Sequence, residues 1–102
     1  MRERFLVVYE HGKRNYGGFA PDIPGCMSTG KSLTKIRSLM REALEAHLEF
    51  MASDGDPLPK PTTTTFDLST IDDPNGEVDH YVVELMEINM PASRQTKEVL
   101  SA

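Results

Sequence analysis

Three kinds of side chain in this sequence could take part in chemistry: carboxylates, imidazoles and one thiol. Glu10, Asp22 and Glu84 are the carboxylates that could converge on a cation. Metal-assisted nuclease chemistry needs at least two such groups around one ion, and no spacing here requires the three to meet. We therefore interpret them as solvated or turn-forming acids. Asp22, which lies in a proline-bracketed turn, is predicted to accept hydrogen bonds from neighbouring backbone N–H groups.

The histidines and the cysteine give no pattern typical of a metal site or a nucleophile. His11 is predicted in a loop, His47 on a helix and His80 on a strand, with nothing in the sequence to bring them together. We predict structural or surface roles for all three and expect neither a metal ion nor another cofactor. Cys26 is the only cysteine, so a disulfide within the chain is excluded, and its expected role is that of a small buried hydrophobic residue. These residues favour a protein that is not an enzyme.

The length and composition are typical of one small globular domain. The chain has 102 residues, of which 38% are hydrophobic and 26% are charged. No apolar run approaches the roughly 18–20 residues that a membrane-spanning helix needs, so no membrane association is expected. The first residues lack the long apolar block of a signal peptide. We therefore expect a cytoplasmic protein.

The charge is distributed unevenly along the chain. Residues 1–52 hold eight Lys or Arg against six Asp or Glu, whereas residues 53–102 hold three against ten, and the net charge is −5. An acidic second half disfavours binding to nucleic acid, because phosphate contacts need a basic face. Lys13, Arg14 and the cations early in the helix could touch RNA, but no aromatic residues are interleaved with them. The pattern suits a partner with a basic surface, and ordinary solubility is the alternative explanation.

The hydrophobic pattern predicts an α+β domain with the order β-β-β-α-β. Strands are expected at 4–10, 16–21, 26–28 and 78–88. One helix ends near residue 52, and its expected N-cap is Ser32, with Thr34 as the next choice. The first three strands form an antiparallel meander, the last strand returns to the sheet, and the long helix packs on one face. The strand at 4–10 is apolar on both faces, so we expect it to be central.

Several glycines and the segment after the helix give more local predictions. Gly17 and Gly18 weaken a strand, which indicates a bulge or a close backbone approach. Gly12 is free to take a positive φ in a hairpin connection, and Gly25 allows a tight turn. Residues 62–65 are predicted as either a strand or an exposed extended strip. Three later residues are expected to fold back against the core: Phe66, Leu68 and Ile71.

Eleven residues between positions 9 and 32 carry a resemblance to a known family. They are Tyr9, Glu10, Gly18, Phe19, Pro21, Asp22, Pro24, Gly25, Cys26, Gly30 and Ser32. In this order, followed by an Ala-containing helix and a Gly-to-Pro segment at 55–61, they resemble the HicB-like antitoxins. The similarity is strongest over residues 4–61 of an expected domain at 1–90, which is followed by a short tail at 91–102. The sequence leaves open whether these motif residues are structural or face a partner.

The resemblance implies a partial ribonuclease-H-like fold that lacks the catalytic acids of ribonuclease H. It also implies binding to a small basic HicA-like toxin that cleaves mRNA, with the antitoxin blocking the RNA site of the toxin. Members of this family often add a DNA-binding segment, and the dozen residues after the last strand are too few for one, which speaks against direct DNA binding. Open sheet edges favour a homo-oligomer, a dimer or a tetramer. Two alternatives stay open: a homo-oligomer without a toxin partner, and a divergent nuclease that uses Asp22.

Overall fold

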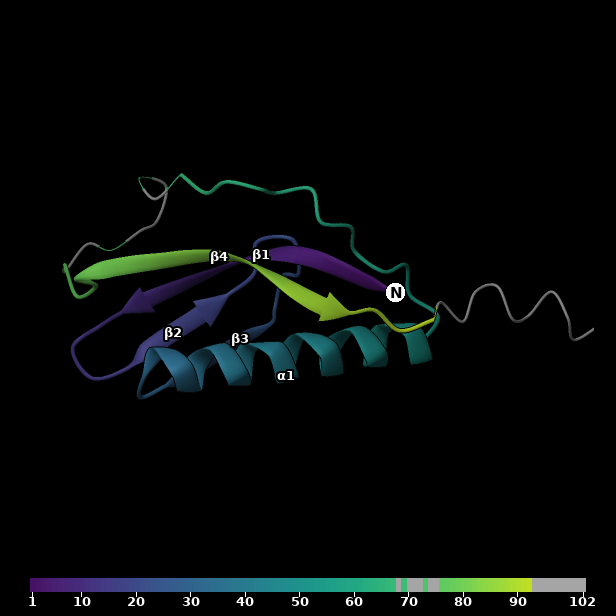
Figure 1. Ribbon diagram of the computed structural model, residues 1–102, viewed down its shortest axis with the longest axis horizontal. Coiled ribbons are helices and arrows are strands. Elements are labelled where there is room, and N and C mark those ends of the chain that lie inside the picture. The colour runs from purple at the N-terminus through teal and green to yellow at the C-terminus, as the bar shows by residue number, and fades with distance from the viewer. Residues whose placement is uncertain (68, 70–72, 74–75, 93–102) are drawn as a thin grey trace, which may run out of the picture.

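The computed structural model describes residues 1–67, 69, 73 and 76–92. Four strands form one antiparallel sheet in the order β3-β2-β1-β4, and a single long helix crosses one face of it (Figure 1). The elements are β1 (Arg2–His11), β2 (Tyr16–Phe19), β3 (Met27–Gly30), α1 (Leu33–Ser53) and β4 (His80–Asn89). The predicted α+β class and the order β-β-β-α-β are therefore confirmed. The predicted domain boundary after residue 90 stays a prediction, because residues 93–102 lie outside the described residues.

The strand bounds differ from the predicted ones because pairing between distant segments sets them. β1 extends beyond the predicted 4–10 at both ends, since β4 pairs with it over ten residues, from Arg2 opposite Asn89 to His11 opposite His80. β2 ends at Phe19, two residues before Pro21, which has no N–H to donate to a ladder. β3 starts one residue later than expected and runs two residues further, so that it matches the full length of β2.

The hydrophobic core lies between the sheet and α1. Ile36, Met40, Leu44 and Leu48 form the buried stripe of the helix, at the spacing of one helical face. They pack on side chains of β1 that alternate along the strand, at Phe5, Val7 and Tyr9. Two more residues of β1, on its other face, are also buried: Leu6 and Val8. The central position predicted for this strand is therefore confirmed. His47, predicted on the buried stripe, is only half-buried.

Gly18 allows α1 to approach the sheet closely. A Cβ atom at this position would lie 2.8 Å from the Cγ atom of Met40 and 3.3 Å from a ring carbon of Tyr9. At Gly17, the next residue along the strand, a Cβ atom would meet nothing within 4 Å. The glycine pair was predicted to mark either a bulge or a close backbone approach. The structure shows a close approach, and it occurs at Gly18.

The start of α1 confirms the predicted N-cap. The Ser32 hydroxyl accepts a hydrogen bond from the Lys35 N–H at 3.1 Å, which satisfies one of the free donors of the first turn. The helix ends at Ser53, and Gly55 follows with a φ of 78°. Gly25 also has a positive φ, of 86°, as expected for its turn. Gly12, which is free to take a positive φ, does not have one.

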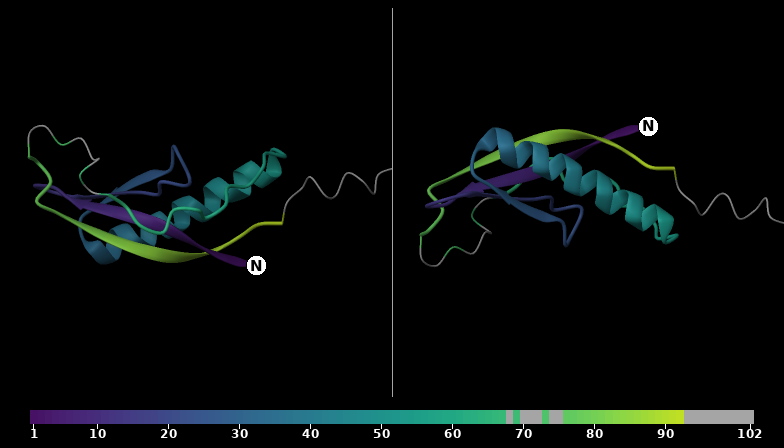
Figure 2. Two further views of the ribbon diagram at one scale, coloured as in Figure 1. Left: turned by 90° about the horizontal axis from the view of Figure 1, so that it is seen from above. Right: turned by 90° about the horizontal axis from the view of Figure 1, so that it is seen from below.

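After α1 the chain passes to the face of the sheet opposite the helix (Figures 1 and 2). This connector, residues 57–66, contains no strand. Residues 62–65 were predicted to be either a strand or an exposed extended strip, and the structure shows the strip. Phe66 folds back onto the sheet, where its ring meets the ring of Phe19 edge-on with 5.6 Å between the ring centroids. It was predicted to fold against the core, but it is not among the residues that pack there. The predicted contacts of Leu68 and Ile71 lie outside the described residues.

Candidate partner-binding surface

The exposed side of α1 changes sign along the helix. Its first part carries Lys35, Arg37 and Arg41. From the middle onward it carries Glu42, Glu45 and Glu49, followed by further acids beyond the end of the helix. The first turn contains no acid and the last turn no base, so these charges oppose the helix dipole. We therefore attribute the stability of α1 to its buried stripe and to side chains that reach β4.

Arg37 joins α1 to the inner face of β4. Its guanidinium donates two hydrogen bonds to the Glu84 carboxylate, at 2.7 and 3.3 Å. The buried Tyr9 hydroxyl lies near this ion pair but outside hydrogen-bond geometry. Burial raises the pKa of Tyr9 well above its ordinary value, and the neighbouring Glu84 charge raises it further. The phenol is therefore held in its neutral form.

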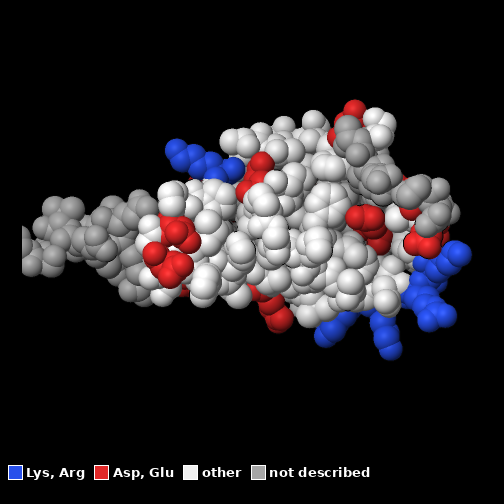
Figure 3. Space-filling view, turned by 180° about the vertical axis from the view of Figure 1, so that it is seen from behind, with Lys and Arg blue, Asp and Glu red and all other residues white. Residues whose placement is uncertain are grey.

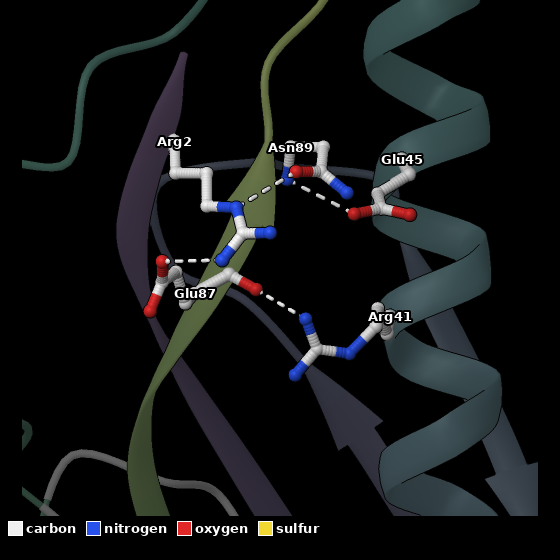
Figure 4. Close-up of polar contacts among 5 residues, drawn as sticks. All are labelled: Arg2, Arg41, Glu45, Glu87 and Asn89. Carbon is white, nitrogen blue, oxygen red and sulfur yellow. Dashed lines mark hydrogen bonds and ion pairs between the residues drawn. The ribbon is translucent and has the colours of Figure 1, made fainter.

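A second network covers the outer edge of β4 near its C-terminal end (Figure 4). The Arg41 guanidinium donates to the backbone carbonyl of Glu87, and the Glu45 carboxylate accepts from the backbone N–H of Asn89 at 2.9 Å. Arg2 reaches the side chains of both strand residues, each at 3.2 Å. Because β4 is an edge strand, these helix side chains occupy backbone groups that a further strand would otherwise use.

The middle of β4 leaves its edge more accessible. In an antiparallel edge strand, every second residue directs its backbone N–H and C=O groups away from the sheet. The backbone N–H of Asn89 donates to Glu45 on α1, so in β4 the odd-numbered residues are the ones with outward-directed backbone groups. Val83 and Leu85 belong to this set, and their side chains are 40% and 46% exposed. The structure therefore has a short apolar edge next to a stretch that α1 has closed.

The part of α1 from Glu42 onward, with the residues just beyond the helix, combines acids with an exposed aromatic ring. We call this surface, Glu42, Glu49, Phe50, Asp54 and Asp56, the acidic helix end. The Phe50 side chain is 67% exposed, which is unusual for a residue of that size. None of the four carboxylates forms an ion pair with another residue that the structure describes. On the face shown in Figure 3, most Lys and Arg side chains gather at one end, whereas Asp and Glu spread along its length.

The eleven motif residues occupy positions that shape the scaffold. Three of them are buried: Tyr9, Gly18 and Cys26. A Cβ atom on Gly30 would lie 3.1 Å from the backbone nitrogen of Ile36, so this glycine lets β3 pass close to the start of α1. Glu10 and Phe19 are half-buried, as is Pro21, while Pro24 and Gly25 are exposed, as is the capping Ser32. Contact of any of them with a partner stays a prediction.

Asp22 has a different role from the predicted one. Its carboxylate accepts hydrogen bonds from the backbone N–H groups of Thr62 and Thr63 at 2.9 and 2.8 Å, and from their hydroxyls at 3.2 and 2.7 Å. These residues lie about forty positions away, so the prediction of local backbone partners was wrong. Partial burial works against the charged form, but the bonds from Thr63 and Thr62 outweigh it and hold the pKa of Asp22 below its ordinary range. The turn thereby anchors the connector.

The three carboxylates considered for metal-assisted cleavage do not converge. Glu10 lies on the outer face of the sheet with its strand partner Tyr81, while Glu84 lies on the inner face with Val7. Asp22 is engaged by the connector. Burial and the nearby charge of Asp73 raise the pKa of Glu10, but among the described residues no group of three or more potential metal ligands includes Glu10, Asp22 or Glu84.

The histidines overturn one expectation. His11 and His80, predicted to be separate, are direct partners across β1 and β4, and their rings stack with centroids 4.7 Å apart. The prediction failed because it placed His11 in a loop, whereas β1 continues through it. The Asp79 carboxylate contacts both imidazole rings. The hydrogen bond from His11 is the main reason that the pKa of Asp79 lies below its ordinary value. His47 lies on α1, away from this group.

Cys26 is buried, as predicted, with 6% of its surface exposed. Burial in an apolar environment raises the pKa of its thiol, so little thiolate forms at neutral pH. The thiol is therefore poorly suited to act as a nucleophile.

Two open grooves lie on the sheet side of the molecule. One, of about 500 Å³, is lined by the β1–β2 hairpin and by outward-facing residues of β2 and β3, among them Met27. The other, of about 810 Å³, lies between the connector at Leu58 to Thr62 and the segment that follows β4, next to Met1. Both grooves are open to solvent. In the described part of the chain, no helix has the length and apolar character to cross a membrane.

Comparisons with curated proteins give two partial relatives. A UPF0150 protein of Thermotoga maritima is 39% identical over 44 residues, which are 43% of this chain and 59% of that protein. An uncharacterised 14.9 kDa protein from the rep-hol intergenic region of Haemophilus phage HP1 is 42% identical over 56 residues, which are 55% of this chain and 42% of that protein. The chain thus spans about half the length of these relatives.

Solved structures give the same fold. The N-terminal domain of the Burkholderia pseudomallei antitoxin HicB matches with a TM-score of 0.61, 22% identity and coverage of 86% of this chain and all of that chain. A chain of a HicA3 and HicB3 toxin–antitoxin complex matches with a TM-score of 0.56, also at 22% identity, over 88% of this chain and all of that one. The model of the family described as HicB_like antitoxin of bacterial toxin-antitoxin system matches residues 5–100. The chain therefore belongs to the HicB-like antitoxin family.

Proposed function

We propose that this protein is an antitoxin that neutralises a small, basic, HicA-like toxin by covering the RNA-binding site of the toxin. Membership of the HicB-like family over residues 5–100 is the observation that carries the proposal. The likeness of the fold to a chain from a HicA3 and HicB3 complex supports it. The proposal describes a protein that acts by binding and not by catalysis, consistent with an Asp22 carboxylate that is already engaged. Its expected location is the cytoplasm.

The acidic helix end is the surface that best fits a basic partner. Its carboxylates are exposed and unpaired within the described chain, so they can attract a basic protein over several ångströms and speed its approach. Phe50 adds an apolar anchor in their midst, and aromatic anchors carry a large share of the binding energy in many interfaces. Arg37 and Arg41, which precede the acids on α1, already donate hydrogen bonds to residues of β4. The acidic part of the helix is therefore more available to a partner.

The first experiment is an affinity pull-down of the tagged protein from its native cells, with mass spectrometry of what is recovered. We expect a stoichiometric small basic protein.

Association of the recovered toxin should slow by about tenfold or more between low and high salt, because salt screens the charges that steer the encounter. Phe50→Ser should weaken the affinity by about tenfold to a hundredfold. Both effects are measurable by surface plasmon resonance.

Met27→Ser is the matched control for Phe50→Ser. Met27 is also a large exposed apolar residue, at 74%, but it lies on β3 at the other edge of the sheet, and its removal should leave the affinity unchanged. An association rate that does not change with salt would contradict charge steering. Equal losses in the two variants would contradict docking at the acidic helix end. Recovery of the protein alone would favour the alternative function, a homo-oligomer without a toxin.

We also propose that the accessible part of the β4 edge pairs with a second copy of the chain to form a homodimer. The observation that favours it is the apolar pair Val83 and Leu85 on an edge strand whose other end is closed by Arg41 and Glu45. Leu85→Lys should convert the dimer to a monomer in analytical ultracentrifugation, because charge on an edge strand prevents strand pairing. Phe50→Lys, on the helix, should leave the dimer intact. A dimer that persists in Leu85→Lys would contradict pairing at this edge.

A further inference from the structure

We propose that His11, Asp79 and His80 form a binding site for one divalent transition-metal ion such as Zn²⁺. The Nδ1 atoms of His11 and His80 lie 2.6 and 2.8 Å from the same oxygen, Oδ1 of Asp79. The three potential ligand atoms all lie within 4.8 Å of one another. This inference is independent of the proposed antitoxin function.

The fold holds these side chains in place before any ion arrives. His11 is the last residue of β1 and His80 the first of β4, and the two stand directly opposite each other at the end of a ten-residue ladder. The backbone N–H of Asp79 donates to the carbonyl of His11 at 2.9 Å, which fixes the third residue. Tyr16 packs its ring against His11, with centroids 4.5 Å apart. The backbone positions of the three residues are therefore set before an ion binds, which lowers the conformational entropy lost on binding.

The ligand types indicate which ion would bind. Two imidazole nitrogens and one carboxylate oxygen are a set that suits zinc and its neighbours, whereas Ca²⁺ and Mg²⁺ prefer oxygen ligands alone. Metal–ligand bonds of about 2.0–2.2 Å in a tetrahedron place the ligand atoms roughly 3.4 Å apart. The present distances to Asp79 are shorter, and its side chain, 63% exposed, is free to rotate by the small amount needed. Three protein ligands leave a further position for water or for a ligand from another molecule.

The site connects two strands that are far apart in the sequence. An ion held by residues 11, 79 and 80 would clamp the end of β1 to the start of β4. Any ion that binds the folded chain more tightly than the unfolded chain stabilises it. Zinc should therefore raise the melting temperature of the protein, in addition to binding it.

The test uses the full chain, with its affinity tag removed, and titrates it with ZnCl₂ by isothermal calorimetry. We expect one Zn²⁺ per chain and a rise in melting temperature. His80→Gln and Asp79→Asn should each weaken zinc binding by about tenfold or more and reduce the rise in melting temperature at a given zinc concentration. His47→Gln is the matched control, because it removes a histidine from α1 and leaves the three ligands untouched, so its zinc affinity should equal that of the unaltered protein.

Nuclear magnetic resonance of the unaltered protein gives a second readout that does not depend on the variants folding. Zinc should shift the imidazole signals of His11 and His80 and leave those of His47 in place. Absence of binding at millimolar zinc would overturn the proposal, and the three residues would then form only a hydrogen-bonded group. Binding that is equally strong in Asp79→Asn and His80→Gln, or shifts confined to His47, would overturn it as well.

Discussion

Gly18→Val should lower the free energy of unfolding by about 3 kcal/mol, whereas Gly17→Val should change it by less than about 0.5 kcal/mol. The reason is the approach of α1 to β2. Even a single Cβ atom at Gly18 would lie 2.8 Å from the Cγ atom of Met40, which is fully buried. The branched side chain of valine adds two further methyl groups at this contact. Gly17 faces open space, and valine is well suited to a strand.

The two variants are a matched pair, since the same substitution is made at neighbouring residues of one strand. Urea denaturation followed by circular dichroism measures both free energies of unfolding, and the loss in Gly18→Val corresponds to a melting temperature lower by roughly 10 °C or more. Equal stability of the two variants would show that Met40 and its neighbours can rearrange at little cost. The close packing of α1 against β2 would then not be a constraint on this fold.

Asp22→Ala should lower the free energy of unfolding by about 2 kcal/mol near neutral pH. The substitution removes all four hydrogen bonds that hold the connector at Thr62 and Thr63. Amide hydrogen exchange should then show the N–H groups of these two threonines losing protection, while the β1–β4 ladder keeps its own. Asp56→Ala removes an exposed carboxylate from the segment between α1 and the connector and serves as the control, with little expected effect.

The contribution of Asp22 should also depend on pH. Its pKa in the folded protein is lowered, chiefly by the bonds from Thr63 and Thr62, so folding favours the charged form. The stabilisation is therefore fully present above the carboxyl pKa of the unfolded chain, about 4, and is lost as the pH falls through the lower pKa of the folded state. The difference in stability between the unaltered protein and Asp22→Asn should shrink as the pH is lowered from 7 to 3. A difference that stays constant over this range would contradict the role of the charge.

Much of the fold could be predicted from the sequence because it depends on local patterns. The spacing of Ile36, Met40 and Leu44 predicts the buried face of α1 without reference to any partner, and Ser32 marks its start. The apolar character of both faces of residues 5–8 predicts a central strand. The order of the elements and the motif between residues 9 and 32 were enough to indicate the family, which the match over residues 5–100 confirms.

The contacts between distant residues could not be predicted in the same way. The pairing of His11 with His80, the bonds from Thr62 and Thr63 to Asp22, and the closure of the β4 edge by Arg41 and Glu45 each join residues about forty or more positions apart.

Such contacts depend on the register of β1 against β4 and on the path of the connector. A shift of one residue in that register would move every side chain of β4 to the opposite face of the sheet. The composition and periodicity of a segment are the same in either register. The sequence by itself therefore determined the elements, their order and the buried faces, and the packing of the whole chain decided which polar residues meet.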